Sequence, residues 1–333
     1  MDLHELALRQ VLTSYWLSQM VYVAAKLGIA DLLAQGPKTA AELATATGSH
    51  AQSLYRVLRA LAGFEIFAED ELGQFVLTPM AEPLRTDYPH SARGAAMMVG
   101  EEHFRAWGEL LYSVQTGGCA FEHVYGKNLF EYLAEHPEKG KIFDAAMTGV
   151  HGLESAAMCD AYDFSAFNHV IDVGGGNGST LATILQRHPR LHGTLFDLPA
   201  VVERAKPRFH QAGLADRVTL LGGSFFESVP SGADAYVLRH IIHDWDDQRS
   251  KRILDACRAA IPQQGRLLVV ESVIARGNEP SFGKLLDVNM LVVPGGMERT
   301  EEEYRDLFTL SGFELSRIVP TTEEVAVIEG LPR

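Results

Sequence analysis

The stretch VIDVGGGNGST, residues 170–180, decides the fold. An apolar run there contains the acid Asp172 and leads directly into Gly174, Gly176 and Gly178. Glycine weakens strands and helices alike, so such a cluster needs a local reason. The usual reason is a backbone that must come close to a nucleotide-like ligand at the turn between a strand and a helix. We therefore expect a buried strand, a ligand-binding turn and a helix here.

Strand and helix patterns alternate on the C-terminal side of this turn. The strand patterns are HVIDVGG, LHGTLFDLP, RVTLLGG, AYVLRHI and GRLLVVES, and helical patterns such as STLATILQRHP lie between them. This alternation predicts an α/β fold with a parallel sheet that helices cover on both faces. The final stretch FELSRIVPTTEEVAVIEG predicts two antiparallel strands at one edge of that sheet.

On the N-terminal side, residues 1 to about 95 predict helices followed by a hairpin. The run LALRQVLTSYWLSQMVYVAAKLGIADLLAQG has apolar residues at helical spacing and ends before a Gly-Pro stop signal. Two shorter helical runs follow, with Thr39 and Ser49 as the expected N-caps. The stretch AEDELGQFVLTP then predicts a hairpin that turns through Asp70–Gly73. Three helices and a hairpin are typical of a winged-helix domain.

The composition is that of an ordinary soluble protein. The 333 residues are 47% hydrophobic and 22% charged, and no uncharged apolar run reaches the roughly 18 residues of a membrane span. The formal net charge of −14 argues against long nucleic acids, whose phosphates require clustered Lys and Arg. No signal-peptide pattern opens the chain, and Cys119, Cys159 and Cys257 are widely spaced. We therefore expect reduced thiols and a cytoplasmic protein.

The N-terminal helices also carry an apolar stripe that a monomer seldom leaves in water. Its residues are Tyr15, Trp16, Met20, Val21 and Tyr22. The stripe predicts a homodimer that is built through the N-terminal helices.

The glycine spacing favours a ligand without phosphate. The loop reads G-x-G-x-G, with Ser179 where the third glycine of a dinucleotide fingerprint would fall, which disfavours an NAD-dependent dehydrogenase. A second acid, Asp197, ends the next strand pattern, where a carboxylate can accept both hydroxyls of a ribose. A ligand such as S-adenosylmethionine fits both features.

Five blocks occur in order along the chain: VIDVGGGNGS, GTLFDLPAVVERA, GGSFFESVPSGADAYVLRHIIHDWDD, LLVVESVI and DVNMLVVPGGMERTEEEYRDLFTLSGFEL. They resemble the S-adenosylmethionine-dependent O-methyltransferases of the caffeic-acid and hydroxyindole type, which include bacterial enzymes of phenazine and polyketide tailoring. The resemblance covers nearly the whole chain. It implies a Rossmann-like class I methyltransferase sheet with an N-terminal α-helical, winged-helix-like dimerisation domain.

The same resemblance implies the domain boundaries and the chemistry. The dimerisation domain is expected at 1–95 and the methyltransferase domain at 101–333, with helices of 101–160 over the acceptor pocket. The expected methyl donor is S-adenosyl-L-methionine, the expected by-product is S-adenosyl-L-homocysteine, and no metal is expected. The expected acceptor is a phenolic hydroxyl of a small aromatic metabolite.

A phenol has an ordinary pKa of about 10, so its methylation needs a base at neutral pH. His243 is the expected base, because it follows the strand AYVLRHI, opens the helical pattern HDWDDQRSKRIL and coincides with the catalytic histidine of the resembled family. His240 is the weaker candidate. The resemblance assigns Glu271 and Glu298 as carboxylates that orient the base.

Further contacts to the cofactor carry over from the resemblance. The expected cofactor-binding residues are Asp172, Gly174, Gly176, Asp197, Leu198, Ser224, Phe225 and Arg239. Phe225 stands where a hydrophobic residue covers the adenine. Ser224 replaces an acid that many members place near the adenine, so a charge-assisted hydrogen bond is lost. Arg239 stands where the family usually has a lysine near the methionine carboxylate, and either cation can serve.

The helices before the sheet and the loop after Asp287 are expected to wall the acceptor pocket. The expected wall residues are Trp107, Phe143, Met147, Met290 and Val293. An apolar pocket with methionines suits a flat aromatic, although each residue singly is equally typical of a core. We interpret Asp244, Asp246 and Asp247 as acids that favour the start of a helix, rather than as a metal site.

Alternative functions stay open at this stage. A winged-helix transcription regulator needs a basic surface, but SLYRVLRALAGF carries only Arg56 and Arg59, and the hairpin EIFAEDELGQ is acidic, so we expect no DNA binding. A relative that methylates nitrogen, or one that binds the cofactor for a non-methylating reaction, is the closer rival. A histidine base with two carboxylates favours O-methylation, because a neutral ring nitrogen needs no deprotonation.

Overall fold

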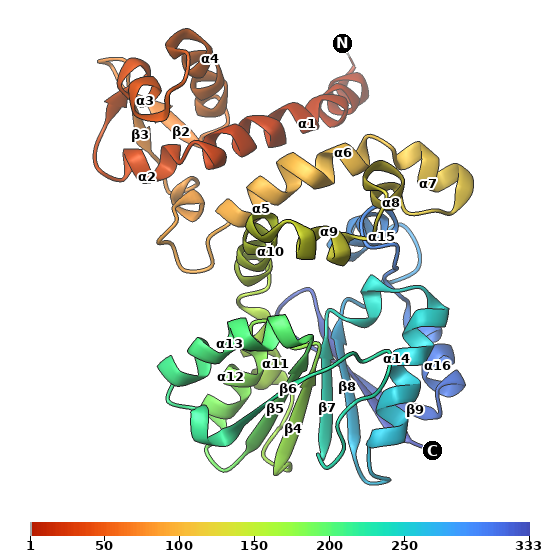
Figure 1. Ribbon diagram of the computed structural model, residues 1–333. Coiled ribbons are helices and arrows are strands. Elements are labelled where there is room, and N and C mark those ends of the chain that lie inside the picture. The colour runs from red at the N-terminus through yellow and green to blue at the C-terminus, as the bar shows by residue number, and fades with distance from the viewer. Residues whose placement is uncertain (1) are drawn as a thin grey trace. The chain divides into compact units, whose positions relative to one another are not determined.

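A seven-stranded sheet organises the C-terminal part of the chain (Figure 1). The structure, a computed structural model, describes residues 2–333. The strands of the large sheet are β4 (His169–Val173), β5 (His192–Asp197), β6 (Val218–Gly222), β7 (Ala235–Arg239), β8 (Arg266–Glu271), β9 (Phe313–Pro320) and β10 (Ala326–Pro332). Their order is β6-β5-β4-β7-β8-β10-β9, and β10 pairs antiparallel with both of its neighbours, whereas the other pairs are parallel. The predicted parallel strands and the antiparallel edge pair are confirmed.

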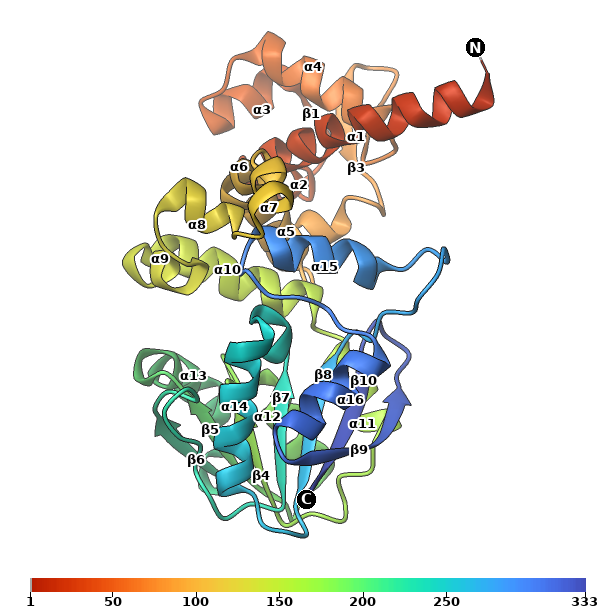
Figure 2. The same cartoon turned by 90° about the vertical axis from the view of Figure 1, so that its right-hand side faces the viewer.

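Helices cover both faces of this sheet (Figure 2). One face carries α11 (Glu154–Ala161), α12 (Ser179–Arg187) and α13 (Pro199–Gln211), and the other carries α14 (Asp247–Ala260) and α16 (Glu301–Leu310). Successive residues of a strand point to opposite faces. In β4, Val170 packs in one core with Leu181 of α12, whereas Ile171 packs in the other core with Leu254 of α14. Burial on both sides explains why the strands appear as continuous apolar runs in the sequence.

The N-terminal region contains helices and a small antiparallel sheet, β1-β3-β2. Its elements are α1 (Leu3–Lys26), α2 (Ile29–Leu33), β1 (Lys38–Thr39), α3 (Ala40–Thr47), α4 (Ala51–Ala62), β2 (Phe67–Glu69) and β3 (Gln74–Leu77). The predicted hairpin is confirmed, and the Asp70 carboxylate accepts from the backbone N–H of Leu72 and Gln74 in its turn. The helices that follow are η1 (Glu82–Leu84), α5 (Arg93–Met98), η2 (Val99–His103), α6 (Phe104–Trp107), α7 (Leu110–Thr116), α8 (Ala120–Tyr125), α9 (Leu129–Glu135) and α10 (Pro137–Val150).

One of the two predicted helix N-caps is confirmed, and the other is wrong. Thr39 is the predicted N-cap of α3, with a full capping box to Glu42, but the N-cap of α4 is His50 and not Ser49. The N–H of Ser49 still bonds the last turn of α3, so the chain becomes extended one residue later. The first predicted helix is also divided, because Gly28 adopts a left-handed conformation (φ +67°) between α1 and α2.

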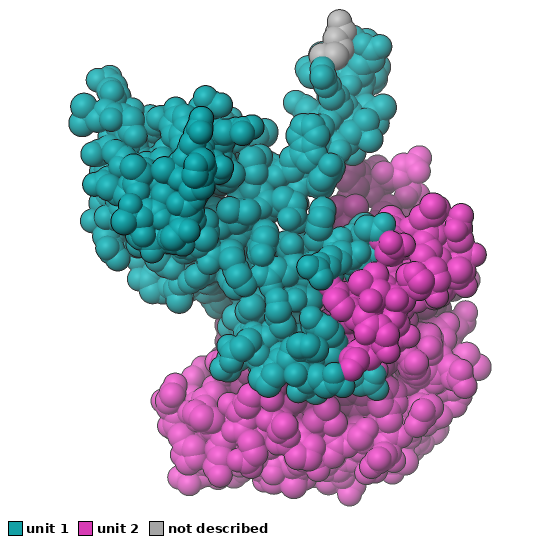
Figure 3. Space-filling model, turned by 45° about the horizontal axis from the view of Figure 1, so that its top comes forward, with its two compact units in different colours: residues 1–108, 130–152 teal, residues 109–129, 153–333 magenta. Residues whose placement is uncertain are grey.

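Two compact units divide the chain (Figure 3). One contains the described residues up to Gly108 together with Phe130–Gly152, and the other contains Glu109–Leu129 and Leu153–Arg333. Compactness does not by itself define functional domains, so the boundaries at 95 and 101 stay a prediction. Among residues 2–333, no helix is both long enough and apolar enough to cross a bilayer.

The cores on the two sides of the sheet predict how substitutions change stability. Replacing Leu268 in β8, which is 0% exposed, by alanine leaves a cavity and should lower the free energy of unfolding by about 2–5 kcal/mol. Leu285→Ala, at a leucine that is 67% exposed, is the matched control and should change it by less than about 0.5 kcal/mol. Urea denaturation measures both, and equal losses would contradict the assignment of the core.

Candidate active site

The glycine turn joins β4 to α12, and its backbone explains the glycines. Gly174, Gly176 and Gly178 all have positive φ, at +69°, +57° and +75°. A Cβ on Gly174 would lie 2.5 Å from Cδ1 of Ile241, and a Cβ on Gly178 would lie 2.5 Å from Cζ of Phe209. At Gly176 nothing lies within 4 Å of such an atom. Two glycines therefore allow close packing beneath the turn, and the third leaves its outer side open.

Two acids flank this turn. The Asp172 side chain is buried at the end of β4, and its Oδ2 has no hydrogen-bond partner among residues 2–333. Burial raises the pKa of Asp172 from its ordinary value to about 7, although the cation of Arg239 opposes the rise. Asp197 ends β5, where its carboxylate accepts from the backbone N–H of Gly176 at 2.8 Å and of Leu198 at 2.6 Å. The structure thus brings the glycine turn and both predicted acids to one edge of the sheet.

The other predicted cofactor residues lie around the same edge. Cε1 of Phe225 lies 3.3 Å from the position that a Cβ on Gly174 would take, so its ring reaches the glycine turn. The Ser224 hydroxyl accepts from the N–H of Phe226 at 3.3 Å and shapes its own turn.

Arg239 is engaged within the protein rather than extended from it. Its Nε donates to Thr180 Oγ1 and its Nη1 to Glu154 Oε2, each at 2.8 Å. The neighbouring His240 adopts a left-handed conformation (φ +53°), and its Nε2 lies 2.7 Å from the same Glu154 oxygen. The weaker base candidate therefore shares a carboxylate with Arg239.

His243 lies in the short 3-10 turn η4 (Ile242–Asp244), between β7 and α14. The prediction that it opens a helix is wrong, because Asp246 is the N-cap of α14 and the helix begins four residues after His243. Its Nδ1 lies 2.6 Å from Glu298 Oε1. Because a carboxylate only accepts, Nδ1–H donates to Glu298 and leaves Nε2 as the nitrogen that can take a proton.

The charges around His243 set its protonation. Burial is the largest single effect and lowers the pKa of His243, but the carboxylates around it, chiefly Glu298, together outweigh burial and raise the pKa to about 10. Asp244 and Glu271 act in the same direction. The Oδ1 of Asp244 lies 3.6 Å from Nε2, and burial raises the pKa of Asp244 to about 7. These carboxylates therefore favour the charged form of His243, and the imidazole can act as a base only in its neutral form.

Glu271 does not orient the imidazole, so that part of its predicted role is wrong. Its Oε1 accepts from the backbone N–H groups of Ile241, Ile242 and His243 at 3.0, 2.6 and 3.1 Å. Its Oε2 accepts from the hydroxyl of Tyr304 at 2.6 Å. A carboxylate at the end of β8 satisfies these three N–H groups because they converge in the turn after β7, the neighbouring strand. Glu271 holds the backbone that carries His243.

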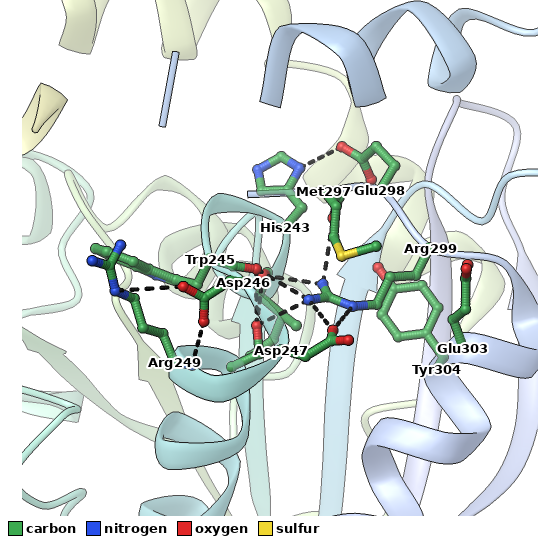
Figure 4. Close-up of polar contacts among 12 residues, drawn as sticks. His243, Trp245, Asp246, Asp247, Arg249, Met297, Glu298, Arg299, Glu303 and Tyr304 are labelled. Atoms are coloured by element: carbon green, nitrogen blue, oxygen red, sulfur yellow. Dashed lines mark hydrogen bonds and ion pairs between the residues drawn. The ribbon is translucent and has the colours of Figure 1, made fainter. Parts of the chain in front are cut away.

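Sequence reasoning missed Glu154, Arg299 and Tyr304. Glu154 and Tyr304 lie far along the chain from their partners, and no spacing pattern marks them. Arg299 carried one signal, its place directly after Glu298. In Figure 4 its side chain extends between the residues that follow His243 and Tyr304 of α16.

The predicted pocket residues fall in different units. Trp107, Phe143 and Met147 belong to the unit that contains Phe130–Gly152. Met290 and Val293 belong to the other unit, where both are buried at the end of α15 (Phe282–Val292). Whether the five side chains wall one pocket stays a prediction.

Comparisons with known proteins agree with this architecture. The family model described as O-methyltransferase domain matches residues 107–314, and the one described as O-methyltransferase dimerisation domain matches residues 9–87. A phenazine O-methyltransferase of Lysobacter antibioticus, PhzM, is 49% identical over 98% of this chain and 95% of its own. A phenazine-1-carboxylate N-methyltransferase of Pseudomonas aeruginosa is 35% identical over 96% and 95%.

Solved structures give the same result. The crystal structure of LaPhzM superposes with a TM-score of 0.96 at 48% identity and covers 100% of both chains. That of NcsB1, an O-methyltransferase from neocarzinostatin biosynthesis in complex with S-adenosylmethionine and 2-hydroxy-5-methyl naphthoic acid, has a TM-score of 0.86 at 36% identity and covers 95% and 96%. The class I methyltransferase fold and the dimerisation domain expected from the sequence are confirmed.

The contact between His243 and Glu298 predicts a measurable change in protonation. Glu298→Gln removes the main charge that opposes burial, so the pKa of His243 should fall from about 10 by about 1 to 3 units. An NMR titration of the imidazole signal that disappears in His243→Ala measures this shift. Glu329 is the matched control, because it is also a buried carboxylate but pairs with Arg317 and not with His243. Glu329→Gln should leave the titration of His243 unchanged. An unshifted pKa in Glu298→Gln would contradict the assigned contact.

Proposed function

Because the chain belongs to the O-methyltransferase family, we propose that it transfers the methyl group of S-adenosylmethionine to a phenolic hydroxyl of a small aromatic secondary metabolite, with His243 as general base. The observation that carries this proposal is the buried pair of His243 and Glu298 at the carboxyl ends of the parallel strands. Ligands of open parallel sheets bind at that edge.

The residues at the glycine turn fit the adenosyl cofactor. The open space over Gly176 permits close approach to its backbone, and the unpartnered Oδ2 of Asp172 offers a buried acceptor. The Asp197 carboxylate stands at the tip of β5, in reach of a ribose, with Leu198 exposed beside it. Phe225 offers an apolar surface for an adenine, which Ser224 can assist only through a neutral hydroxyl.

Arg239 has fewer free N–H groups for the cofactor than the sequence predicts. Two of its nitrogens already donate to Thr180 and Glu154, which fixes the guanidinium against α11 and α12. A cation held in this way contributes a positive field at the methionine end of the cofactor without turning towards it. NcsB1, whose crystal structure contains S-adenosylmethionine, supports this cofactor for the relative, and the shared fold extends the proposal to this chain.

The proposed chemistry requires His243 to accept the phenolic proton at Nε2. Glu298 holds the tautomer by accepting from Nδ1–H, so the free lone pair lies on the other nitrogen once the ring is neutral. The bound cofactor would supply an electrophilic methyl group on a positively charged sulfur. The chain contributes the base and the alignment of the acceptor, and general-base catalysis typically accelerates a reaction by about 10²- to 10⁴-fold.

The second candidate function is N-methylation. A relative that is 35% identical is named a phenazine-1-carboxylate N-methyltransferase, so overall similarity does not decide between the two acceptors. The paired His243 and Glu298 favour oxygen, because they provide a proton acceptor that a neutral nitrogen does not need.

We also propose a homodimer. A dimerisation-domain model matches residues 9–87, and α1 carries large apolar side chains that are exposed in the single chain. They are Leu3, Leu6, Leu8, Val11, Leu12, Tyr15 and Trp16. Burial of these side chains by a second copy would remove them from water.

The base assignment predicts a selective loss of turnover. His243→Ala should lower kcat by about 10²- to 10⁴-fold and leave the Kd of S-adenosylmethionine nearly unchanged, because the imidazole is needed for the acceptor proton. Methyl transfer to a panel of hydroxylated phenazines, naphthoates and indoles measures kcat, and calorimetry measures Kd. Exposed His192 provides the control variant, His192→Ala. Wild-type turnover in His243→Ala would remove the base assignment.

The ribose assignment predicts the opposite pattern. Asp197→Ala should weaken S-adenosylmethionine, because the carboxylate at the tip of β5 would lose both ribose contacts, each worth about 1.5–3 kcal/mol. Calorimetry measures the affinity of the wild type and of the variant for S-adenosylmethionine and for S-adenosylhomocysteine. The exposed acid Asp216 offers a control, Asp216→Ala, that should bind like the wild type. Unchanged affinity in Asp197→Ala would count against the ribose role.

A further inference from the structure

Arg299 is a completely buried arginine, 0% exposed, that directly follows Glu298. Its guanidinium donates to the backbone carbonyls of Ile242 and Met297 at 3.3 Å and of Trp245 at 3.0 Å. It also donates to Ser250 Oγ at 3.2 Å.

The partner charge of Arg299 is the Asp247 carboxylate. The distances from Oδ1 to Nη2 and Nε are 2.8 and 3.1 Å (Figure 4). This carboxylate is 71% exposed, so water also stabilises it. A fully buried charge is costly unless hydrogen bonds satisfy it. Here two bonds lead to the carbonyls of Ile242 and Trp245, which flank the His243 turn, and three lead to Asp247 and Ser250 in the first turns of α14.

The turn around His243 is held from two sides. Glu271 accepts its N–H groups, as described above, and Arg299 donates to carbonyls on either side of His243. The loop between α15 and α16 completes the contact, because Met297 N–H donates to the His243 carbonyl at 2.9 Å. A Cβ on Gly296 would lie 2.0 Å from that same oxygen, so only glycine permits the approach.

We propose that Arg299 is a positioning residue for the reaction: it joins the loop that carries Glu298 to the turn that carries His243, so that base and carboxylate keep their hydrogen bond. The proposal rests on the proposed function in that His243 acts there as the base. Glu298 and Arg299 are consecutive, so one short segment supplies the carboxylate for the imidazole and the guanidinium for its backbone.

Lysine cannot replace this guanidinium. Arginine presents five N–H donors in a rigid planar fork, whereas the lysine ammonium has three donors around a single point. The positive charge is the same in both. Arg299→Lys therefore changes the positions of His243 and Glu298 without changing the charge near them.

The test compares Arg299→Lys with Arg217→Lys in the full-length protein. Arg217 also donates to several backbone carbonyls, those of Leu185, His188, Pro189 and Leu191, but it lies after α13, away from the His243 turn. Both variants should lower the melting temperature. Only Arg299→Lys should lower kcat, by about tenfold or more, with the Kd of S-adenosylmethionine within about threefold of the wild type.

A second readout does not require turnover. In Arg299→Lys the imidazole of His243 should titrate at lower pH than in the wild type, since the contact that raises its pKa loosens while the net charge stays the same. In Arg217→Lys the titration should be unchanged. If the wild type neither binds S-adenosylmethionine nor transfers methyl groups, the proposed function fails, and the NMR titration still decides the role of Arg299.

Asp247→Asn covers the case in which Arg299→Lys does not fold, because Asp247 is exposed and its loss is tolerated more easily. It weakens the anchor of Arg299 and should lower kcat by a smaller factor, about two- to fivefold. Asp255→Asn, on the same helix, is its control and should leave kcat unchanged. Equal kcat and equal His243 titration in Arg299→Lys and Arg217→Lys, or equal kcat in the two aspartate variants, would overturn the proposal.

Discussion

The hydrogen bond between His243 Nδ1 and Glu298 Oε1 is the interaction on which the site depends. Burial makes a charged imidazole costly, and the carboxylate makes it favourable, so the contact sets the proton affinity of the only side chain that we assign as a base. The two atoms lie 2.6 Å apart, so a displacement of either backbone by about 1 Å would break the hydrogen bond. His243 and Glu298 are 55 residues apart in the sequence, and the surrounding polar groups hold their two segments at this distance.

The fold is what makes such accuracy possible. Strands β7 and β8 lie side by side, so a carboxylate at the end of β8 reaches the turn that follows β7. Glu271 thereby anchors the N–H groups of the turn, and Arg299 anchors its carbonyls from the opposite loop. Neither group needs to touch the acceptor. Rigid strands supply the framework, and buried charges supply the directional bonds that apolar packing cannot.

Much of this could be predicted from the sequence, and the failures share a cause. Glycine spacing, strand runs and the edge pair are local patterns, so the sheet and its ligand edge were predicted. The family motifs name both His243 and Glu298, and the structure brings the two side chains into contact, while their catalytic roles stay a proposal. The role of Glu271 was misjudged, because a motif records that a carboxylate is present but not which hydrogen atoms converge on it. Glu154 is 85 residues from Arg239, and only the folded sheet brings them together.

The position of β10 has a consequence for how the protein is made. Although β10 follows β9 in the sequence, it lies inside the sheet between β8 and β9 rather than at its edge. A ribosome therefore exposes β8, with Glu271 at its tip, before the strand that covers its flank has been synthesised. Until β10 emerges from the exit tunnel, this flank of β8 has unpaired backbone N–H and C=O groups, and such an open edge favours pairing with the wrong strand.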